Sequence, residues 1–140
     1  MDRGLFTNNQ ILRNMKLILA IIRIAKMNET KQALSDAGLP SFTAMGVLGR
    51  GQGRGLGPTF QKVISNPENQ DALKQIGVEP RLKSKRMITI VVPDAKKDLA
   101  VETIIKINQT GNSGDGKIIV VEALDSIRVR TGEKGDITLD

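Results

Sequence analysis

Two short segments near the end of the chain carry residue types that bind phosphate. Residues 110–117 read TGNSGDGK, and residues 128–133 read RVRTGE. Glycines let the backbone approach a ligand closely and expose its N–H groups, while lysine and arginine supply positive charge. Together the two segments predict a binding site for a polyphosphate anion.

The first segment matches a phosphate-binding P-loop only in part. Gly111 and Gly116 have the spacing of G-x-x-x-x-G-K-[ST], but Lys117 is followed by Ile118 instead of Ser or Thr. The segment also follows a predicted helix and precedes a predicted strand, so it offers no helix N-terminus to an anion. Backbone N–H groups, Thr110 and Lys117 would have to bind the phosphate, and a plain helix–strand turn is the alternative interpretation.

The second segment places Arg128 and Arg130 two residues apart, within residues 126–130, which we expect to be extended. Side chains at i and i+2 of an extended segment point the same way. Two adjacent guanidinium groups repel each other unless an anion lies near both. A nucleotide phosphate is the functional candidate for that anion, and a carboxylate of another subunit is the alternative.

The composition of the 140-residue chain excludes several classes of activity. It has no Cys and no His, which excludes zinc fingers, thiol chemistry, disulfides and His-dependent triads. Asp115 has no obvious catalytic partner, so we expect no enzyme activity, although Asp115 or a substrate could hold Mg²⁺. The apolar run 17–24 is far shorter than the roughly 20 residues that span a membrane, and residues 1–14 do not resemble a signal peptide. We expect a cytoplasmic protein without membrane insertion.

Most of the net charge of +6 lies in residues 50–86, where eight Lys and Arg face three Asp and Glu. A basic segment can bind nucleic acid, an acidic protein or an anionic small ligand, or it can be a solvated loop. The alternating Gly and Arg of residues 49–57 resemble RNA-binding tracts, but no aromatic residue occurs there before Phe60. We expect no nucleic-acid partner, and a basic-loop RNA-binding protein is the alternative of another class.

The elements that must position these segments follow from the pattern of apolar residues. Apolar runs predict strands over 16–24, 41–48, 86–92 and 118–123, and helices over 28–37 and 95–108. Asn28 and Asp94 are the expected N-caps, and Gly38 is the expected end of the first helix. An apolar face of Leu99, Ile104, Ile105 and Ile107 is expected on the second helix.

The predicted order is strand, helix, strand, long loop, strand, helix, strand. This order is typical of an α+β ferredoxin-like βαββαβ sandwich, with an antiparallel sheet and both helices on one face. Residues 49–84 form the long mobile loop, with a helical turn near 70–76, and 124–140 form a polar tail. The sheet face without helices predicts self-association.

Four stretches of the sequence together resemble the PII nitrogen-regulatory signalling proteins. They are MKLILAII at 15–22, VVPD at 91–94, QTGNSGDGK at 109–117 and IRVRTGE at 127–133. The resemblance covers about residues 15–135, within a domain of residues 15–140. Residues 1–14 fall outside the resemblance and are interpreted as a disordered N-terminal extension.

The resemblance implies a trimer that binds ATP or ADP in clefts between neighbouring subunits. The positions that match the family's nucleotide site are Thr43, Gly49, Ile90, Val91, Thr110, Gly111, Gly114, Asp115, Gly116, Lys117, Arg128 and Arg130. Lys85 and Gln52 are the residues assigned to 2-oxoglutarate, and Mg²⁺ would be held by Gln52 and ATP. The long loop corresponds to the family's partner-binding T-loop, and its basic and aromatic candidates are Arg50, Arg54, Phe60, Lys62 and Arg81.

The long loop departs from the usual family pattern. It begins G-R-G-Q-G-R-G, without the usual Phe, and the usual oxoglutarate-binding Gln aligns with Gly53, beside Gln52. The chain has no Tyr, so regulation by tyrosine nucleotidylation is excluded. The loop start and the greater loop length most resemble the nitrogenase-associated branch of methanogenic archaea.

Membership of that branch would imply a heteromer with a paralogous chain that inhibits the dinitrogenase component, with ATP and 2-oxoglutarate relieving the inhibition. A homotrimer is the other assembly that we consider. The alternative function is that of a generic PII regulator of an ammonium transporter or of glutamine synthetase.

Overall fold

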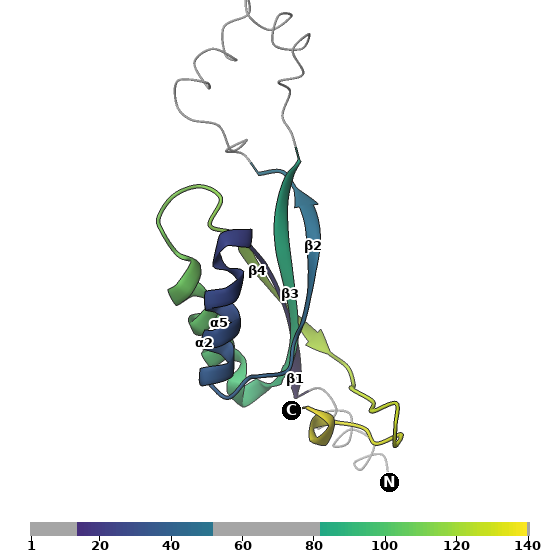
Figure 1. Cartoon of the computed structure of the whole chain (residues 1–140). Coiled ribbons are helices and arrows are strands. Elements are labelled where there is room, and N and C mark those ends of the chain that lie inside the picture. The colour runs from purple at the N-terminus through teal and green to yellow at the C-terminus, as the bar shows by residue number, and fades with distance from the viewer. Residues whose placement is uncertain (1–13, 52–81, 140) are drawn as a thin grey trace, which may run out of the picture.

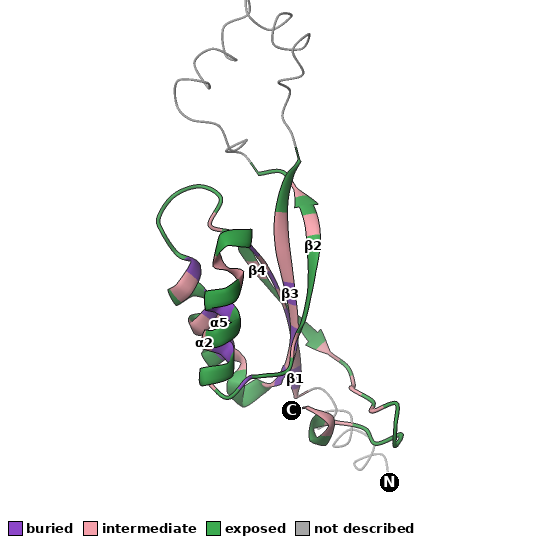
Figure 2. Ribbon diagram, viewed as in Figure 1, coloured by how far each residue is buried: buried purple, intermediate pink, exposed green. Residues whose placement is uncertain are grey.

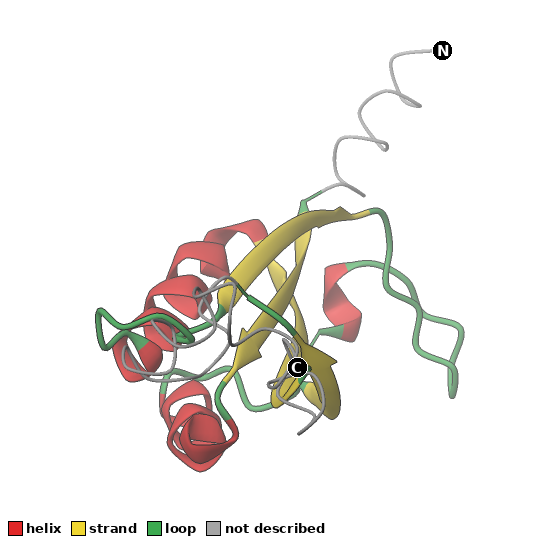
Figure 3. Cartoon of the chain, turned by 90° about the horizontal axis from the view of Figure 1, so that it is seen from above, coloured by secondary structure: helices red, strands yellow, loops and turns green. Residues whose placement is uncertain are grey.

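The computed structural model describes residues 14–51 and 82–139 of the chain. Here four strands form one antiparallel sheet, and two helices cover one of its faces (Figures 1 and 3). The strands are β1 (Met15–Ile22), β2 (Thr43–Gly49), β3 (Lys83–Pro93) and β4 (Lys117–Ala123), in the sheet order β2-β3-β1-β4. The helices are α2 (Met27–Asp36) and α5 (Asp94–Asn108), with short 3₁₀ turns η1 (Ile24–Lys26) and η3 (Asp136–Thr138). The predicted ferredoxin-like α+β fold is confirmed.

The hydrophobic core lies between the sheet and the two helices. Alternate residues of a strand point to opposite faces, so β1 from Ile18 to Ile22 and β3 from Ile88 to Val92 bury every second residue against the helices (Figure 2). The buried core residues are Ile18, Ala20, Ile22, Leu34, Leu39, Ile88, Ile90, Val92, Ala100 and Ile104. The core is therefore entirely aliphatic, and Phe42 packs only against its border.

The strand pairing defines two ends of the sheet. At the upper end of Figure 1, Gly49 pairs with Lys83 and Ile21 pairs with Lys117. At the lower end, Met15 pairs with Ala123. Since β4 advances about 3.3 Å per residue, its seven residues separate the two ends by roughly 20 Å. We call these the upper end and the lower end of the subunit.

The second face of the sheet is covered by no helix in the described part of the chain. Leu17 and Leu19 of β1 lie on this face, opposite Val121 and Ile119 of β4. Ile119 and Val121 are 42% and 43% exposed, and Met45 of β2 is 55% exposed. This exposed apolar surface is the feature from which self-association is predicted.

Several predicted boundaries shift in the structure. Ile24 lies in η1 rather than in β1, and β3 begins at Lys83, within the range predicted as loop. Gly38 has φ +82°, which agrees with its predicted role in ending α2. Asn28 does not cap α2, because the helix begins at Met27 and Lys26 precedes it.

Helix α5 also differs from the prediction in the face that it buries. Ala100, Ile104 and Asn108 are buried, whereas Leu99 and Ile105 are about two-fifths exposed. Two residues of the expected apolar face, Leu99 and Ile105, therefore lie at the edge of the buried face of α5. The cost of burying the Asn108 amide is partly offset, because its Nδ2 donates to Thr30 Oγ1 of α2 at 3.0 Å and to the Ile104 carbonyl at 2.9 Å.

The predicted N-terminal extension, apart from Asn14, and the helical turn near 70–76 lie outside the described residues. Of the helices that the structure describes, none has the length and apolar character needed to cross a bilayer.

Candidate anion-binding site

The glycine turn, residues 110–117, joins α5 to β4 at the upper end of the subunit. Gly111, Gly114 and Gly116 have φ values of +87°, +94° and +117°, which favour glycine. Gly116 is further restricted by space, because an added Cβ would lie 2.0 Å from the Ile21 carbonyl oxygen. The turn therefore requires glycine at all three positions for its backbone conformation, and at Gly116 also because the turn lies close to β1 there.

Asp115 organises the turn from within. Its Oδ2 accepts hydrogen bonds from the backbone N–H groups of Thr110 at 2.7 Å and Gly111 at 2.9 Å, and its Oδ1 accepts one from the Thr110 hydroxyl. The Thr110 hydrogen bonds, with those from Arg23 and Gly111, hold the pKa of the Asp115 carboxyl well below its usual range. Asp115 is therefore ionised at neutral pH.

Two basic side chains from the sheet bind the outside of the turn. Arg23, directly after β1, donates from Nη1 to Asp115 Oδ1 at 2.7 Å and from Nη2 to the Ser113 carbonyl at 3.0 Å. Lys85 of β3 donates to the Gly114 carbonyl at 2.9 Å. The turn is thereby attached to two strands besides β4, which it precedes.

The upper end has an excess of positive charge around this turn. Desolvation lowers the pKa of Lys85, and the neighbouring Arg23 and Lys83 lower it further, against the opposite effect of Asp115. A bound anion would relieve this repulsion. The N–H groups of Ser113, Gly114 and Asp115 donate to no acceptor among the described residues. The turn therefore keeps backbone donors and nearby cations available for an anion.

The C-terminal tail, residues 124–139, lies at the lower end and carries the two predicted arginines. Arg128 Nη1 donates to Glu133 Oε1 at 2.7 Å, and its Nη2 donates to the Ile137 carbonyl at 3.2 Å. Hydrogen bonds from Thr131 and Arg128 lower the pKa of Glu133.

The prediction that residues 126–130 are extended is wrong at their end. Val129 and Arg130 lie in a turn, which the Gly132 N–H closes by donating to the Arg128 carbonyl at 2.7 Å. Gly132, at φ +76°, permits that turn. Arg130 is exposed, whereas Arg128 is engaged by Glu133, so the argument that both side chains point the same way along an extended segment no longer applies.

A hollow at the lower end, which we call the lower pocket, adjoins the tail. It has a volume of about 320 Å³ and is lined by Ser41, Phe42, Thr43, Thr89, Ile90, Val91, Ser126, Thr138 and Leu139. It brings together three predicted nucleotide-site residues, Thr43, Ile90 and Val91. The Ile90 side chain is only 3% exposed and belongs to the core, so Ile90 can contribute little more than its backbone to this pocket.

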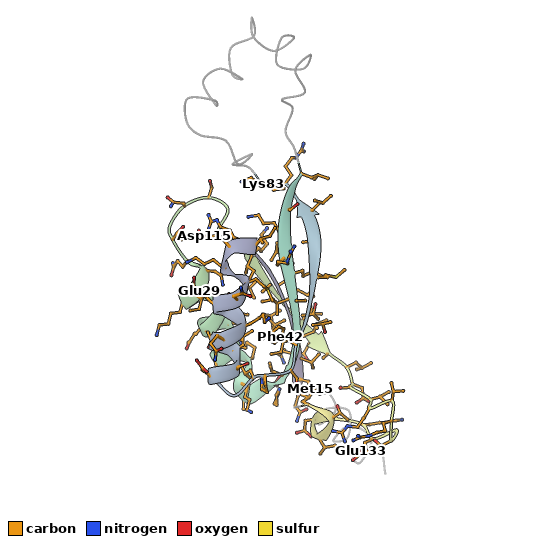
Figure 4. All side chains as sticks on the ribbon, viewed as in Figure 1. Met15, Glu29, Phe42, Lys83, Asp115 and Glu133 are labelled. Carbon is orange, nitrogen blue, oxygen red and sulfur yellow. The ribbon has the colours of Figure 1, made fainter. Side chains whose placement is uncertain are left out.

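The predicted site residues thus divide between the two ends of one subunit. Figure 4 shows Asp115 and Glu133 at opposite ends. The upper group consists of Gly49, Lys85, Thr110, Gly111, Gly114, Asp115, Gly116 and Lys117, with Arg50 exposed just beyond β2. The lower group consists of Thr43, Ile90, Val91, Arg128 and Arg130. Gln52, Arg54, Phe60, Lys62 and Arg81 lie outside the described residues.

Arg23 is the residue at this site that sequence reasoning missed. Its signal was present, because it interrupts the apolar run 17–24 at the end of a strand. Nothing in the sequence, however, indicates that residue 23 faces residues 113 and 115. Within the part of the chain that the structure describes, no group of three or more Asp and Glu side chains is placed to hold a metal ion.

Comparisons with known proteins give one consistent family. The family model described as nitrogen regulatory protein P-II matches residues 15–133. A "nitrogen fixation nifHD region GlnB-like protein 2" of Methanobacterium ivanovii is 44% identical over 87% of this chain and 97% of its own length.

Two solved structures share the fold. The GlnK–ATP complex of B. subtilis has a TM-score of 0.65 and 30% identity, covering 89% of this chain and 97% of that one. Arabidopsis thaliana PII bound to citrate has a TM-score of 0.65 and 27% identity, covering 89% and 88% respectively.

Proposed function

The chain belongs to the family of nitrogen regulatory protein P-II, and from this premise we propose that it senses ATP or ADP at a site shared between two subunits. Proteins of this family are regulators rather than catalysts. The relative from M. ivanovii carries a name that refers to a nitrogen-fixation gene region, which favours a regulatory role in nitrogen fixation for this chain. A solved relative binds ATP, which supports the choice of nucleotide.

The observation that carries this proposal is the division of the predicted site between the two ends of the subunit. The glycine turn lies at the upper end, while Arg128 and Arg130 lie in the tail at the lower end, roughly 20 Å away along β4. One subunit cannot bring both groups to the same phosphate chain. A neighbour placed with its lower end against this upper end would supply the missing arginines.

The exposed sheet face supports such an assembly. Leu17, Leu19, Ile119 and Val121 form an apolar surface that the two described helices leave uncovered. Burying this face against other copies would be favourable and would leave the helices outside. We propose a trimer, made of identical chains or of this chain and a paralogue.

The residue roles follow from this arrangement. The free N–H groups of the glycine turn and Lys117 bind the phosphates of the nucleotide, and Gly49 lies beside them. The neighbour's Arg128 and Arg130 neutralise the same phosphates. Thr43, Ile90 and Val91, which meet at the lower pocket, border the base on the neighbour's side.

We propose that 2-oxoglutarate binds beside the nucleotide, at Lys85 and Gln52. The Lys85 ammonium is already at the turn, where it donates to the Gly114 carbonyl. A solved relative binds citrate, which like 2-oxoglutarate carries several carboxylates. Mg²⁺ would be held by ATP and Gln52, which lies outside the described residues.

Effector binding would regulate a partner through the long loop. The loop leaves the sheet at Gly49 and returns at Lys83, so both of its attachment points lie at the proposed effector site. Coupling between such sites is typically about 1–3 kcal/mol. We propose a nitrogenase component as the partner, contacted by Arg50, Arg54, Phe60, Lys62 and Arg81, and a cytoplasmic location.

Mixed oligomers test the shared site directly. Lys117→Ala damages the upper half of the site and Arg130→Ala the lower half, so each variant alone should bind ATP weakly. If two differently tagged variants are co-expressed and the mixed trimers purified, each mixed trimer should contain one intact site, about a third of the wild-type number. Titration calorimetry would count these sites.

The matched control is a trimer of two differently tagged chains that both carry Lys117→Ala. This trimer should regain no tight ATP site. Failure of the mixed variants to regain any tight site would contradict a shared site.

For the partner, affinity capture from a nitrogen-fixing extract should recover a nitrogenase component only when ATP and 2-oxoglutarate are absent. Recovery of an ammonium transporter or glutamine synthetase would favour the generic role.

A further inference from the structure

Arg23 connects the end of β1 to both sides of the glycine turn. Its two terminal nitrogens bond separate groups, the Asp115 carboxylate at 2.7 Å and the Ser113 carbonyl at 3.0 Å. The Arg23 and Asp115 side chains are 30% and 23% exposed, so the pair is partly shielded from water. A planar guanidinium can make two such bonds at fixed geometry, which a lysine ammonium cannot reproduce.

Asp115 creates a difficulty for an anion site that Arg23 resolves. The carboxylate fixes the turn by accepting from the Thr110 and Gly111 N–H groups, but it also places a negative charge within the turn. An incoming phosphate would be repelled by that charge if it were not paired. Arg23 neutralises it at Oδ1, which also accepts from the Thr110 hydroxyl, whereas the backbone N–H groups of Thr110 and Gly111 bind Oδ2.

The contact with Ser113 has a separate effect. By binding the Ser113 carbonyl, Arg23 fixes the peptide unit whose N–H belongs to Gly114, a donor with no acceptor among the described residues. Lys85 binds the next carbonyl, that of Gly114. The two bonds orient consecutive peptide units, so their N–H groups can be presented together to one anion.

We propose that Arg23 is a positioning residue for the anion site, acting through Asp115 and Ser113 rather than by contacting the phosphate. This inference rests on the proposed nucleotide-binding function. The residue after β1 thereby neutralises Asp115 and orients the peptide unit between Ser113 and Gly114, which neither the glycine turn itself nor the two arginines of the tail do.

The test combines two readouts on the full-length protein. Arg23→Gln should accelerate amide hydrogen exchange at Thr110 and Gly111 about tenfold and weaken ATP binding about tenfold, as the loss of a charge-assisted bond predicts. Exchange along β1 and β4 and the midpoint of urea unfolding should change little. A purely structural role would instead change the turn and the strands together.

Arg86→Gln is the matched control. Arg86 pairs with Ile22 at the same end of the sheet and makes no hydrogen bond to the turn, so this variant removes the same charge without touching Asp115. It should leave exchange at the turn unchanged and ATP affinity within about twofold. Arg23→Lys should recover part of the lost affinity, because it keeps the charge but not both bonds.

The dependence on Asp115 separates positioning from direct contact. In an Asp115→Asn background, Arg23→Gln should cause a clearly smaller loss of ATP affinity, since the charge that it neutralises is gone and only its bond to the Ser113 carbonyl remains. An undiminished loss in that background would show that Arg23 does not act through Asp115 and would overturn the inference. Unchanged exchange at Thr110 and Gly111 in Arg23→Gln would also overturn it. If the wild type bound no ATP, the proposed function would fail, while the exchange experiment would still decide the role of Arg23.

Discussion

The glycine turn and the C-terminal tail contain the same pair of groups, an arginine bound to a carboxylate at 2.7 Å, but are attached to the fold in different ways. In the turn, Arg23 of the β1 end binds Asp115, and Lys85 of β3 binds Gly114. In the tail, the bond of Arg128 to Glu133 and its companions join residues 125–138 to one another. The turn is held by the sheet, whereas the tail is organised mainly by its own residues.

This difference assigns different tasks to the two regions. A region held by several strands can keep its donors oriented before a ligand arrives, which lowers the cost of binding. A locally organised region can change its contacts without disturbing the core. We infer that the turn receives the phosphates and that the tail delivers charge to a neighbour's turn, with Glu133 occupying Arg128 until a phosphate displaces it.

The strongest test of this comparison uses one glycine from each region. Gly116→Ala should lower the free energy of unfolding by about 3 kcal/mol and abolish ATP binding, because the new methyl group would lie 2.0 Å from the Ile21 carbonyl oxygen. Gly132→Ala meets no atom within 4 Å and should cost only about 1 kcal/mol, from its φ of +76°. Urea unfolding at equal protein concentration would measure both. Equal costs would contradict the idea that only the turn is tightly packed.

The two arginines of the tail give the next largest effect. Arg130→Ala should weaken ATP binding about tenfold without changing the unfolding midpoint, because the exposed Arg130 has no hydrogen bond within the described chain. Arg128→Ala should weaken ATP binding and also loosen the tail, because it frees Glu133 and the Ile137 carbonyl.

Titration calorimetry and urea unfolding distinguish the two arginine variants. Lys134→Ala is the matched control from the same tail and should change ATP affinity little. Unaltered ATP affinity in Arg130→Ala would remove the tail from the proposed site.

The fold was predictable because its signals are local. Apolar runs gave the four strands, and Gly38 marked the end of α2. Boundaries were less predictable because they depend on pairing. Lys83 belongs to β3 only because Gly49 continues β2 opposite it, and a sequence next to a glycine-rich loop gives no sign of that register.

The candidate site was predictable in its residue types but not in its contacts. The glycines, Lys117 and the two arginines are visible as motifs. The role of Arg23 depends on its contact with Asp115, which lies 92 residues away in the sequence, and no local pattern encodes such a contact. The turn at Arg130 was missed because the spacing R-x-R fits a strand as well as a turn, and Gly132 decides between them.

Acid should affect the turn more than the tail. The pKa values of Asp115 and Glu133 are lower in the folded chain than their ordinary values of 3.8 and 4.5, so their stabilising contributions are present above those values and are lost as pH falls through the folded pKa. Asp115→Asn should lower the free energy of unfolding at pH 7, and its difference from the wild type should shrink as the pH falls. Glu133→Gln should do so less, because the Glu133 side chain is 42% exposed, against 23% for Asp115.

Thermal unfolding from pH 7 down to pH 1 would measure these acid effects, with Asp98→Asn on α5 as a control, since the Asp98 side chain is 79% exposed. An Asp115→Asn curve that stays parallel to the wild type down to pH 1 would show that Asp115 does not carry this pH dependence.

The smallest expected effect concerns Val129, which lies between the two arginines of the tail and is 99% exposed. Val129→Ser removes no contact within the chain, so the free energy of unfolding should change by less than about 0.5 kcal/mol, as for other exposed positions. Val92→Ser, at a core position that is 1% exposed, is the contrasting variant and should cost several times more. A loss above about 1 kcal/mol in Val129→Ser would mean that another chain covers this side chain in the assembly. The tail would then be held by its neighbour as firmly as the glycine turn is held by the sheet, and the contrast between the two regions would apply only to the isolated subunit.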